Sequence, residues 1–216
     1  MQKICFNDTY NFTYAVVSNE KTQYRKVFDE KNMPPFQQYE MEFHFAEDEN
    51  DPMSSVFRWA NKKNRSEHSE WISSRYKEGE FIAIAQCYKS IYDTGELKGE
   101  GLTEEIKQSP GWTNKFLVKA ESMPWQIQIE RIRVQRLQDI SEKDCLAEGI
   151  RKREDGFYSV GDGLLAVGKG SKRRSYFYTP QEAFAALVDR VEGKGTWNSN
   201  PYVFVYDFKL FKTSVV

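Results

Sequence analysis

The stretch 126–137 constrains the fold more than any other part of this 216-residue chain. Apolar and polar residues alternate along it, which is typical of a β-strand buried on one face. The alternating apolar residues are Ile127, Ile129, Ile132 and Val134. The alternation slips once, at Glu130-Arg131, and this slip predicts a β-bulge or bend. Any fold must therefore accommodate one long, interrupted strand.

Other strand-like segments outnumber the helical ones. Predicted strands cover 2–6, 81–88, 116–120 and 202–211. One predicted helix follows Asp8 and ends near Asn19, and a second covers Glu142–Glu148 between Ser141 and Gly149. A third begins at Thr179-Pro180, and a short helix is expected over 54–63. Because helices and strands do not alternate as βαβ units, the sequence predicts an α+β fold with a small mixed or closed barrel and about three short helices.

The length predicts one domain over 1–216, enlarged by insertions at about 28–72 and 155–178. Aromatic residues make up 15% of the chain, which excludes a disordered protein. No apolar run approaches the roughly 18 residues that a membrane helix needs. The start of the chain is polar, so we expect no signal peptide and a cytoplasmic protein.

The three cysteines are widely spaced and form no CxxC motif. The sequence therefore predicts neither a disulfide framework nor a zinc site, and reduced thiols are the simplest expectation. His44 and His68 both lie in a polar, acidic region, which disfavours a histidine-based catalytic triad or metal site. We expect no metal and no cofactor.

The net charge of −1 hides two regions of opposite sign. Residues 28–51 hold eight acidic residues and one lysine, a net charge of −7, and predict a surface for a protein partner or a mimic of nucleic acid. Residues 131–174 hold 11 basic and seven acidic residues, a net charge of +4. Arg173 and Arg174 precede Tyr176, a combination typical of single-stranded nucleic-acid binding.

Four blocks of the sequence together resemble the ASCH (ASC-1 homology) family, in particular its phage and prophage branch. The blocks are Lys21-Thr22-Gln23-Tyr24-Arg25, Tyr76–Tyr88, Arg133–Ile150 and Thr179–Val205. They occur in the family order and span nearly the whole chain. The resemblance implies a PUA-like pseudobarrel, binding of RNA or modified nucleosides, and a bacterial host cell as the setting if the protein is phage-encoded.

One branch of that family hydrolyses the acetyl amide of N4-acetylcytidine with a Lys, a Thr and a Glu. Carried over by position, the resemblance implies Lys21 and Glu148 as a catalytic pair, with Tyr24 where the family has Thr. It also implies Arg25 and Lys26 at the mouth of the pocket. Gln86 stands where phage relatives often have Glu, and we expect it to bind ligand.

Glu148 falls in the last turn of its predicted helix, where the helix dipole disfavours negative charge. A carboxylate there either pairs with a base or is harder to ionise. Three hypotheses follow: a module that binds RNA or a modified nucleoside, an amidohydrolase acting on an acylated cytidine-like base, and a phage accessory factor with a disused pocket. Convergence of Lys21, Tyr24, Arg25 and Glu148 on one cleft would favour the first two.

Overall fold

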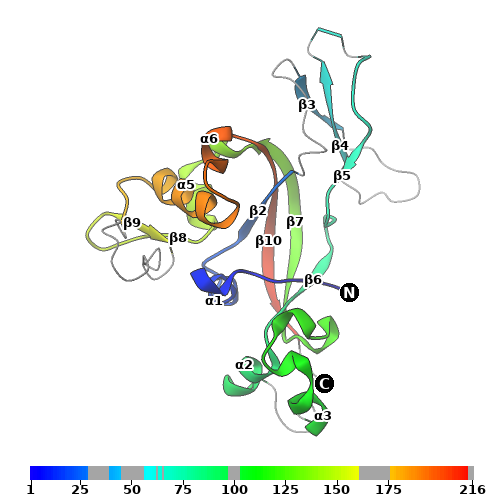
Figure 1. Ribbon diagram of the computed structural model, residues 1–216, viewed down its shortest axis with the longest axis vertical. Helices are drawn as coiled ribbons and strands as arrows, with labels where there is room; N and C mark the ends of the chain where they lie inside the picture. Colours follow the sequence, from blue (N-terminus) through cyan, green and yellow to red (C-terminus); the bar gives the residue numbers. More distant parts are fainter. Residues whose placement is uncertain are drawn as a thin grey trace.

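The computed structural model describes residues 1–28, 39–44, 56–61, 63–64, 66–96, 103–160 and 176–213 (Figure 1). Its centre is a five-stranded sheet in the order β1-β6-β7-β10-β2. The strands are β1 (Gln2–Ile4), β2 (Gln23–Val27), β6 (Phe81–Ile84), β7 (Trp125–Arg136) and β10 (Tyr202–Lys212). β1 runs parallel to β6, whereas the other neighbours are antiparallel. With β1 and β2 at its two edges, the described sheet is mixed and open, in an α+β fold.

The predicted bulge lies in β7, opposite β10. Asp207 faces Arg131 and the next residue, Phe208, faces Ile129, so Glu130 is the extra residue. Because a bulge shifts the side-chain alternation by one position, the isoleucines on both sides of it point to the same face. All four apolar residues predicted to be buried in this strand are buried.

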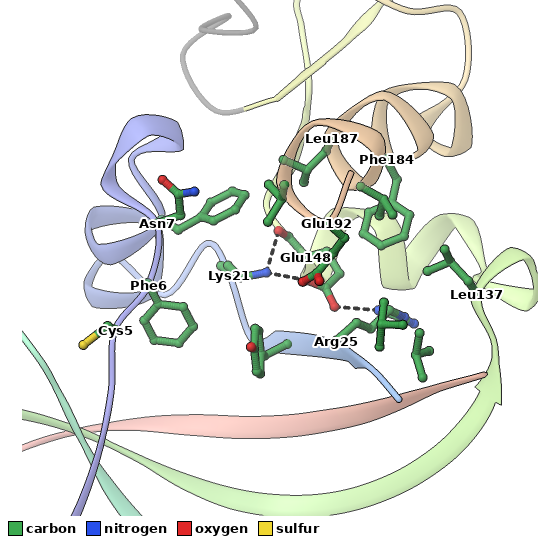
Figure 2. Close-up of a pocket in the computed structure, with 16 residues that line it drawn as sticks. Cys5, Phe6, Asn7, Lys21, Arg25, Leu137, Glu148, Phe184, Leu187 and Glu192 are labelled. Atoms are coloured by element: carbon green, nitrogen blue, oxygen red, sulfur yellow. Dashed lines mark hydrogen bonds and ion pairs between the residues drawn. The ribbon is translucent and has the colours of Figure 1, made fainter. Parts of the chain in front are cut away.

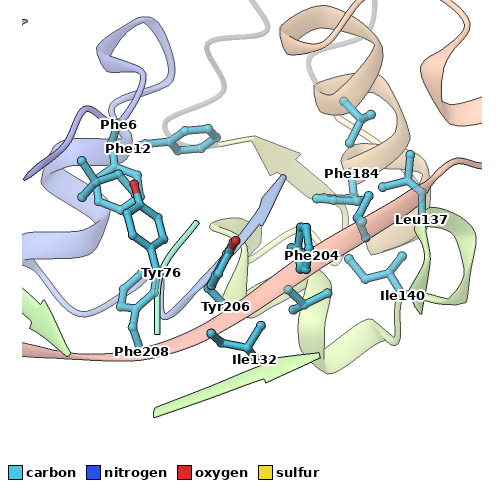
Figure 3. Packing of buried hydrophobic residues seen from close by; sticks show 14 of the residues in the cluster. Phe6, Phe12, Tyr76, Ile132, Leu137, Ile140, Phe184, Phe204, Tyr206 and Phe208 are labelled. Atoms are coloured by element: carbon cyan, nitrogen blue, oxygen red, sulfur yellow. The ribbon is translucent and has the colours of Figure 1, made fainter. Parts of the chain in front are cut away.

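The main core packs on this sheet and is rich in aromatic rings (Figure 3). β10 contributes Phe204, Tyr206 and Phe208 at alternate positions, and all three are buried. Phe204 stacks on Phe28 with ring centroids 4.3 Å apart. A smaller second core lies around β6 and the 88–123 segment, and it includes Tyr88, Ile91 and Met123.

The described residues form six α-helices, more than the three expected, together with several 3-10 turns. The helices are α1 (Phe12–Val17), α2 (Tyr88–Asp93), α3 (Glu104–Gln108), α4 (Glu142–Ala147), α5 (Pro180–Val191) and α6 (Thr196–Ser199). The 3-10 turns are η1 (Asp8–Tyr10), η4 (Pro110–Trp112), η5 (Lys115–Leu117), η6 (Ala120–Ser122) and η7 (Leu137–Asp139).

The predicted helix ends are confirmed where local chemistry sets them. Asn19 adopts φ 61° and Gly149 adopts φ 96°, so both take the left-handed conformation that follows a helix. The Ser141 side chain accepts a hydrogen bond from the amide of Asp144, and Thr179 caps α5 in the same way.

Two predicted elements are wrong. The helix expected over 54–63 is instead β4 (Val56–Asn61), which pairs with β3 (Tyr39–His44) and β5 (Ile72–Ser73) in a separate sheet. Its β-branched and aromatic residues suit a strand, and pairing with β3 on one side and β5 on the other stabilises it. The strand expected over 116–120 is instead two 3-10 turns, η5 and η6, with Phe116 exposed.

The three-stranded sheet lies beyond one end of the central sheet, and α2 and α3 lie at the other end (Figure 1). A hairpin of β8 (Ile150–Lys152) and β9 (Tyr158–Val160) packs near α5. Most of the acidic segment 28–51 falls outside the described residues. No helix in the described part of the chain has the length and apolar character needed to cross a membrane.

Candidate functional site

Lys21, Tyr24, Arg25 and Glu148 line one cavity of about 270 Å³ (Figure 2). They come from two segments that are distant in sequence, residues 21–25 and the end of α4. Lys21 follows the turn after α1, Tyr24 and Arg25 lie on β2, and Glu148 directly follows α4. The structure thus brings together the four residues that the sequence analysis singled out as a group.

Backbone conformation at the two helix ends positions the charged side chains. The left-handed Asn19 lets the chain reverse, and the amide of Lys21 donates to the carbonyl of Ala15 over 2.9 Å. The amide of Thr22 then donates to Ala147 O over 2.8 Å, which joins the start of β2 to the end of α4. Gly149 packs against the Lys21 side chain, since a Cβ on it would lie 3.7 Å from Lys21 Cδ.

A buried ion pair forms the floor of the cavity. Lys21 is 2% exposed and Glu148 is 4% exposed. Lys21 Nζ donates to the Glu148 carbonyl oxygen over 2.8 Å and also to Glu148 Oε2. Arg25 Nη1 donates to the other carboxylate oxygen, Oε1, over 2.8 Å. The Glu148 carboxylate at the end of α4 therefore pairs with two bases, which is one of the two outcomes expected for it.

Asp144 extends this network to a second arginine. Its Oδ2 accepts from Arg25 Nη2 at 3.2 Å and from Arg133 Nη2 at 3.1 Å. Its Oδ1 accepts from Gln23 Nε2 at 2.8 Å. Burial would raise the pKa of Asp144, but the hydrogen bond from Gln23 and the charge of Arg133 outweigh it and hold the pKa below its usual value. Asp144 therefore fixes the Arg25 guanidinium in place.

Burial also changes the ionisation of the cavity residues. The cost of desolvation lowers the pKa of Lys21, while the neighbouring Glu148 carboxylate opposes that shift. Desolvation raises the pKa of the Tyr24 hydroxyl above its ordinary value. The Tyr24 ring stacks on Tyr206 at 6.1 Å between centroids, so Tyr24 is a neutral, packed part of the wall.

The rest of the wall is mostly apolar. Phe6, Phe12, Leu137, Phe184, Leu187, Val188, Val191 and Val203 line it. Lys21 Nζ lies 4.9 Å from the centroid of the Phe12 ring, and the Arg25 guanidinium lies 5.7 Å from that of Phe184. Cation–π contacts of this kind help to keep both charges in a dry environment.

The other predicted site residues lie elsewhere. Lys26 is outside the cavity lining, and its Nζ lies 3.5 Å from Oε2 of Glu192, which does line the cavity. Gln86 is not brought to Lys21, because β6 ends at Ile84 and the chain turns into α2, so that Gln86 lines a second cavity. Arg173 and Arg174 fall outside the described residues.

Sequence reasoning missed Asp144, Phe12 and Phe184. Asp144 precedes Glu148 by four residues on α4, and residues at this spacing lie on one helix face. That spacing was a usable signal for a second carboxylate in the network. The two phenylalanines gave no such signal, because a helical phenylalanine that lines a cavity has the same pattern as one in a core.

The cavity offers poor nucleophiles. Its lining, as the structure describes it, includes no serine or threonine. Burial raises the pKa of the Cys5 thiol, which lowers its reactivity. On α4, burial raises the pKa of Cys145 to about 12. Within the described residues, no three His, Cys, Asp or Glu side chains gather as potential metal ligands.

Comparisons with known proteins find no matching family model, no matching curated protein and no matching solved structure. The residues of the cavity and their contacts therefore carry the functional conclusion.

Proposed function

We propose that this protein binds RNA or a modified nucleoside, with one base held in the cavity above Lys21 and Glu148. The observation that carries the proposal is the convergence of a buried lysine, a buried arginine and a carboxylate on a mostly apolar cavity. Ligand sites of this kind combine apolar walls with a few fixed polar groups. The resemblance of the sequence to the ASCH family points to the same class of ligand.

The polar groups suit the edge of a cytosine-like base. Lys21 has three N–H donors and uses two of them on Glu148, which leaves one for a carbonyl oxygen of the ligand. Each Glu148 carboxylate oxygen accepts one hydrogen bond from the described residues, so each keeps a lone pair for an exocyclic amine or amide N–H. A base carrying both groups would satisfy the pair without breaking it.

The size of the cavity also favours a single base or nucleoside. About 270 Å³ falls just under the ~300 Å³ lower bound of typical small-molecule sites. The rings of Phe12 and Phe184 lie in its wall, where aromatic faces can stack on a base. An oligonucleotide would insert one base and leave its backbone outside.

The test is calorimetric titration of the full chain with cytidine, N4-acetylcytidine and a short single-stranded RNA at two salt concentrations. We expect a nucleoside to bind with little dependence on salt, and the RNA to bind more weakly at high salt. Absence of binding by all three ligands at low salt would contradict the proposal.

A variant that fills the cavity tests the role of the cavity without changing the ion pair. Val191 lines the cavity at the exposed end of α5, so Val191→Trp should fill the cavity without touching Lys21 or Glu148. Leu146→Trp is the matched control, since Leu146 is similarly exposed on α4 but is not part of the lining. We expect the first variant to abolish nucleoside binding and the second to keep it. Equal binding by both would place the ligand elsewhere.

Hydrolysis of an acylated cytidine-like base is a second candidate, favoured by the contact between Lys21 and Glu148 within the cavity. With no serine or threonine in the described lining, water would add to the acyl carbon, the C–N bond would break, and a carboxylic acid and the free amine would form. Glu148 would take the proton of the water and Lys21 would stabilise the oxyanion.

Incubation with N4-acetylcytidine and detection of acetate decides between binding and hydrolysis. Acetate release by the wild type and its loss in Glu148→Gln would establish the enzyme. Tight binding of N4-acetylcytidine without acetate release would leave the binding module as the function.

A further inference from the structure

A second cavity of about 600 Å³ lies on the other side of the η1–α1 segment from the first. The two cavities share this segment as a wall. Asn7 and Phe12 line the first, whereas Asp8 and Thr13, their immediate neighbours in the chain, line the second. Neighbouring residues of the same segment therefore line different cavities, and their Cα atoms are only about 3.8 Å apart.

Gln86 lies in the lining of this second cavity with its side-chain amide unpaired. Its Oε1 is fully buried, and no described residue hydrogen-bonds to it. Within the described part of the chain, Gln86 makes one hydrogen bond, in which its main-chain amide donates to Met123 Sδ at 3.4 Å. Buried polar groups in folded proteins are almost always paired, so an unpaired carboxamide beside a cavity indicates a missing partner.

The charged groups of the lining are already neutralised by other protein groups. Lys115 Nζ lies 2.7 Å from Asp8 Oδ2 and also donates to the carbonyl of Phe6. Glu96 accepts from Trp125 Nε1 at 2.9 Å and lies 3.0 Å from Lys212 Nζ. A ligand that enters this cavity therefore meets hydrogen-bonding groups and no unpaired charge, which favours an uncharged moiety.

Two aromatic side chains at the cavity are exposed. Tyr14 on α1 is 57% exposed and Phe116 on η5 is 65% exposed, and both belong to the lining. Exposed aromatic rings beside a cavity that holds hydrogen-bonding side chains are typical of sites that stack an unpaired base. A carboxamide presents a donor beside an acceptor, the pattern with which Gln and Asn pair to the edge of adenine.

We propose that the second cavity is a site for an unpaired nucleobase, which hydrogen-bonds to the Gln86 amide and stacks on Tyr14 or Phe116. This inference deepens the proposed function: it assigns the second cavity to the nucleotide next to the one held above Lys21 and Glu148. The two cavities together would read two successive bases of a single strand.

The test is an NMR titration of the assigned full-length protein with adenosine, followed through the side-chain amide of Gln86 and the main-chain amide of Asn114. Adenosine should shift both resonances. N6,N6-dimethyladenosine keeps the ring face but lacks the N–H donor, so it should bind at least about tenfold more weakly. Equal affinity for the two nucleosides, or no shift at either resonance, would overturn the second site. Shifts caused by ribose alone, without a response to adenosine, would also overturn it.

Variants test the same contacts. Gln86→Met removes the amide with little change of shape, and Phe116→Ala removes an exposed ring that the fold does not need. Each should weaken adenosine binding at this cavity by about tenfold. Leu117→Ala is the matched control, because Leu117 is the next residue and is 57% exposed but is not part of the lining. Unchanged binding by Phe116→Ala together with Gln86→Met would overturn the proposal.

Resonances of the first cavity are followed in the same titrations, which separates the two proposals. Shifts at Glu148 without shifts at Gln86 would refute the second site and leave the proposed function intact. Shifts at Gln86 without shifts at Glu148 would refute the first cavity and support the second site alone. A dinucleotide should bind at least tenfold more tightly than either nucleoside when both sites are occupied by one strand.

Discussion

Lys21 donates to Glu148 twice, once to its main-chain carbonyl oxygen and once to its carboxylate. Both partners are buried, and Arg25 donates to the remaining carboxylate oxygen. Loss of one charge in such a cluster leaves the other charges without compensation in a poorly solvated place. The pair therefore contributes to the stability of the fold as well as to the cavity.

Glu148→Ala should lower the free energy of unfolding by about 3–5 kcal/mol, because it leaves the buried Lys21 without a carboxylate partner and Arg25 with Asp144 alone. Adding Lys21→Met to that variant should restore part of the loss, since it removes the uncompensated charge. Urea denaturation of the two single variants and the double variant measures the coupling. Strictly additive effects would mean that the two side chains do not interact in solution.

The free energy of unfolding should depend on pH through Asp144, because the pKa of this side chain is lowered in the folded protein. In the folded protein its pKa lies below the unfolded value of ~3.9, so near that pH the unfolded state binds more protons than the native state. The stability due to Asp144 is therefore present above ~pH 4 and is lost as the pH falls through the folded pKa. Wild type and Asp144→Asn should differ in urea midpoint at pH 6, and the difference should shrink as the pH falls below ~4. A difference that stays constant over this range would contradict the prediction.

Deletion of Glu130 should be far more damaging than its substitution. Removal of the bulged residue shifts the alternation by one position, so that the isoleucines on one side of it would turn to the opposite face of β7. We expect the deletion to abolish cooperative thermal unfolding. Glu130→Ala should change the free energy of unfolding by less than ~1 kcal/mol, because it removes only an exposed ion pair with Lys209.

Gly149→Ala should impair nucleoside binding as well as stability. Its positive φ costs an alanine about 1 kcal/mol, and a shift to relieve that strain would move the contact with Lys21. Gly156→Ala is the control, since Gly156 has a similar φ of 85° but no atom within 4 Å of the added Cβ and lies in the β8–β9 turn. Calorimetric titration with cytidine should show weaker binding for the first variant alone.

The features that the sequence predicted well are those that local chemistry decides. The bulge in β7 follows from the alternation of its own residues, and the ends of α1, α4 and α5 follow from Asn19, Gly149 and Thr179. The helix expected over 54–63 failed because β4 depends on strands 39–44 and 72–73 for its pairing. Neither the strand order nor the open edges of the sheet can be read from one segment at a time.

The candidate site was likewise predictable where local chemistry decides the position of a residue, and not where the packing of distant segments decides it. Lys21 and Glu148 each follow a short helix, so helix ends that were predicted correctly also located two charges of the site. Gln86 was expected beside them and lies elsewhere, because its direction depends on how the chain leaves β6 for α2. The role of Asp144 depends on Arg133, which a neighbouring strand supplies.

The pairing of β2 also dictates when the cavity can form during synthesis. Among the described strands, β2 has one partner, β10, whose residues 202–212 are translated long after Lys21 and Arg25. Contacts between segments so far apart in the chain form late, because the whole intervening loop must close first. A nascent chain that already carries Lys21, Arg25 and Glu148 would still lack the strand that holds them in place. Ligand binding should therefore appear only after residues 202–212 have emerged from the ribosome.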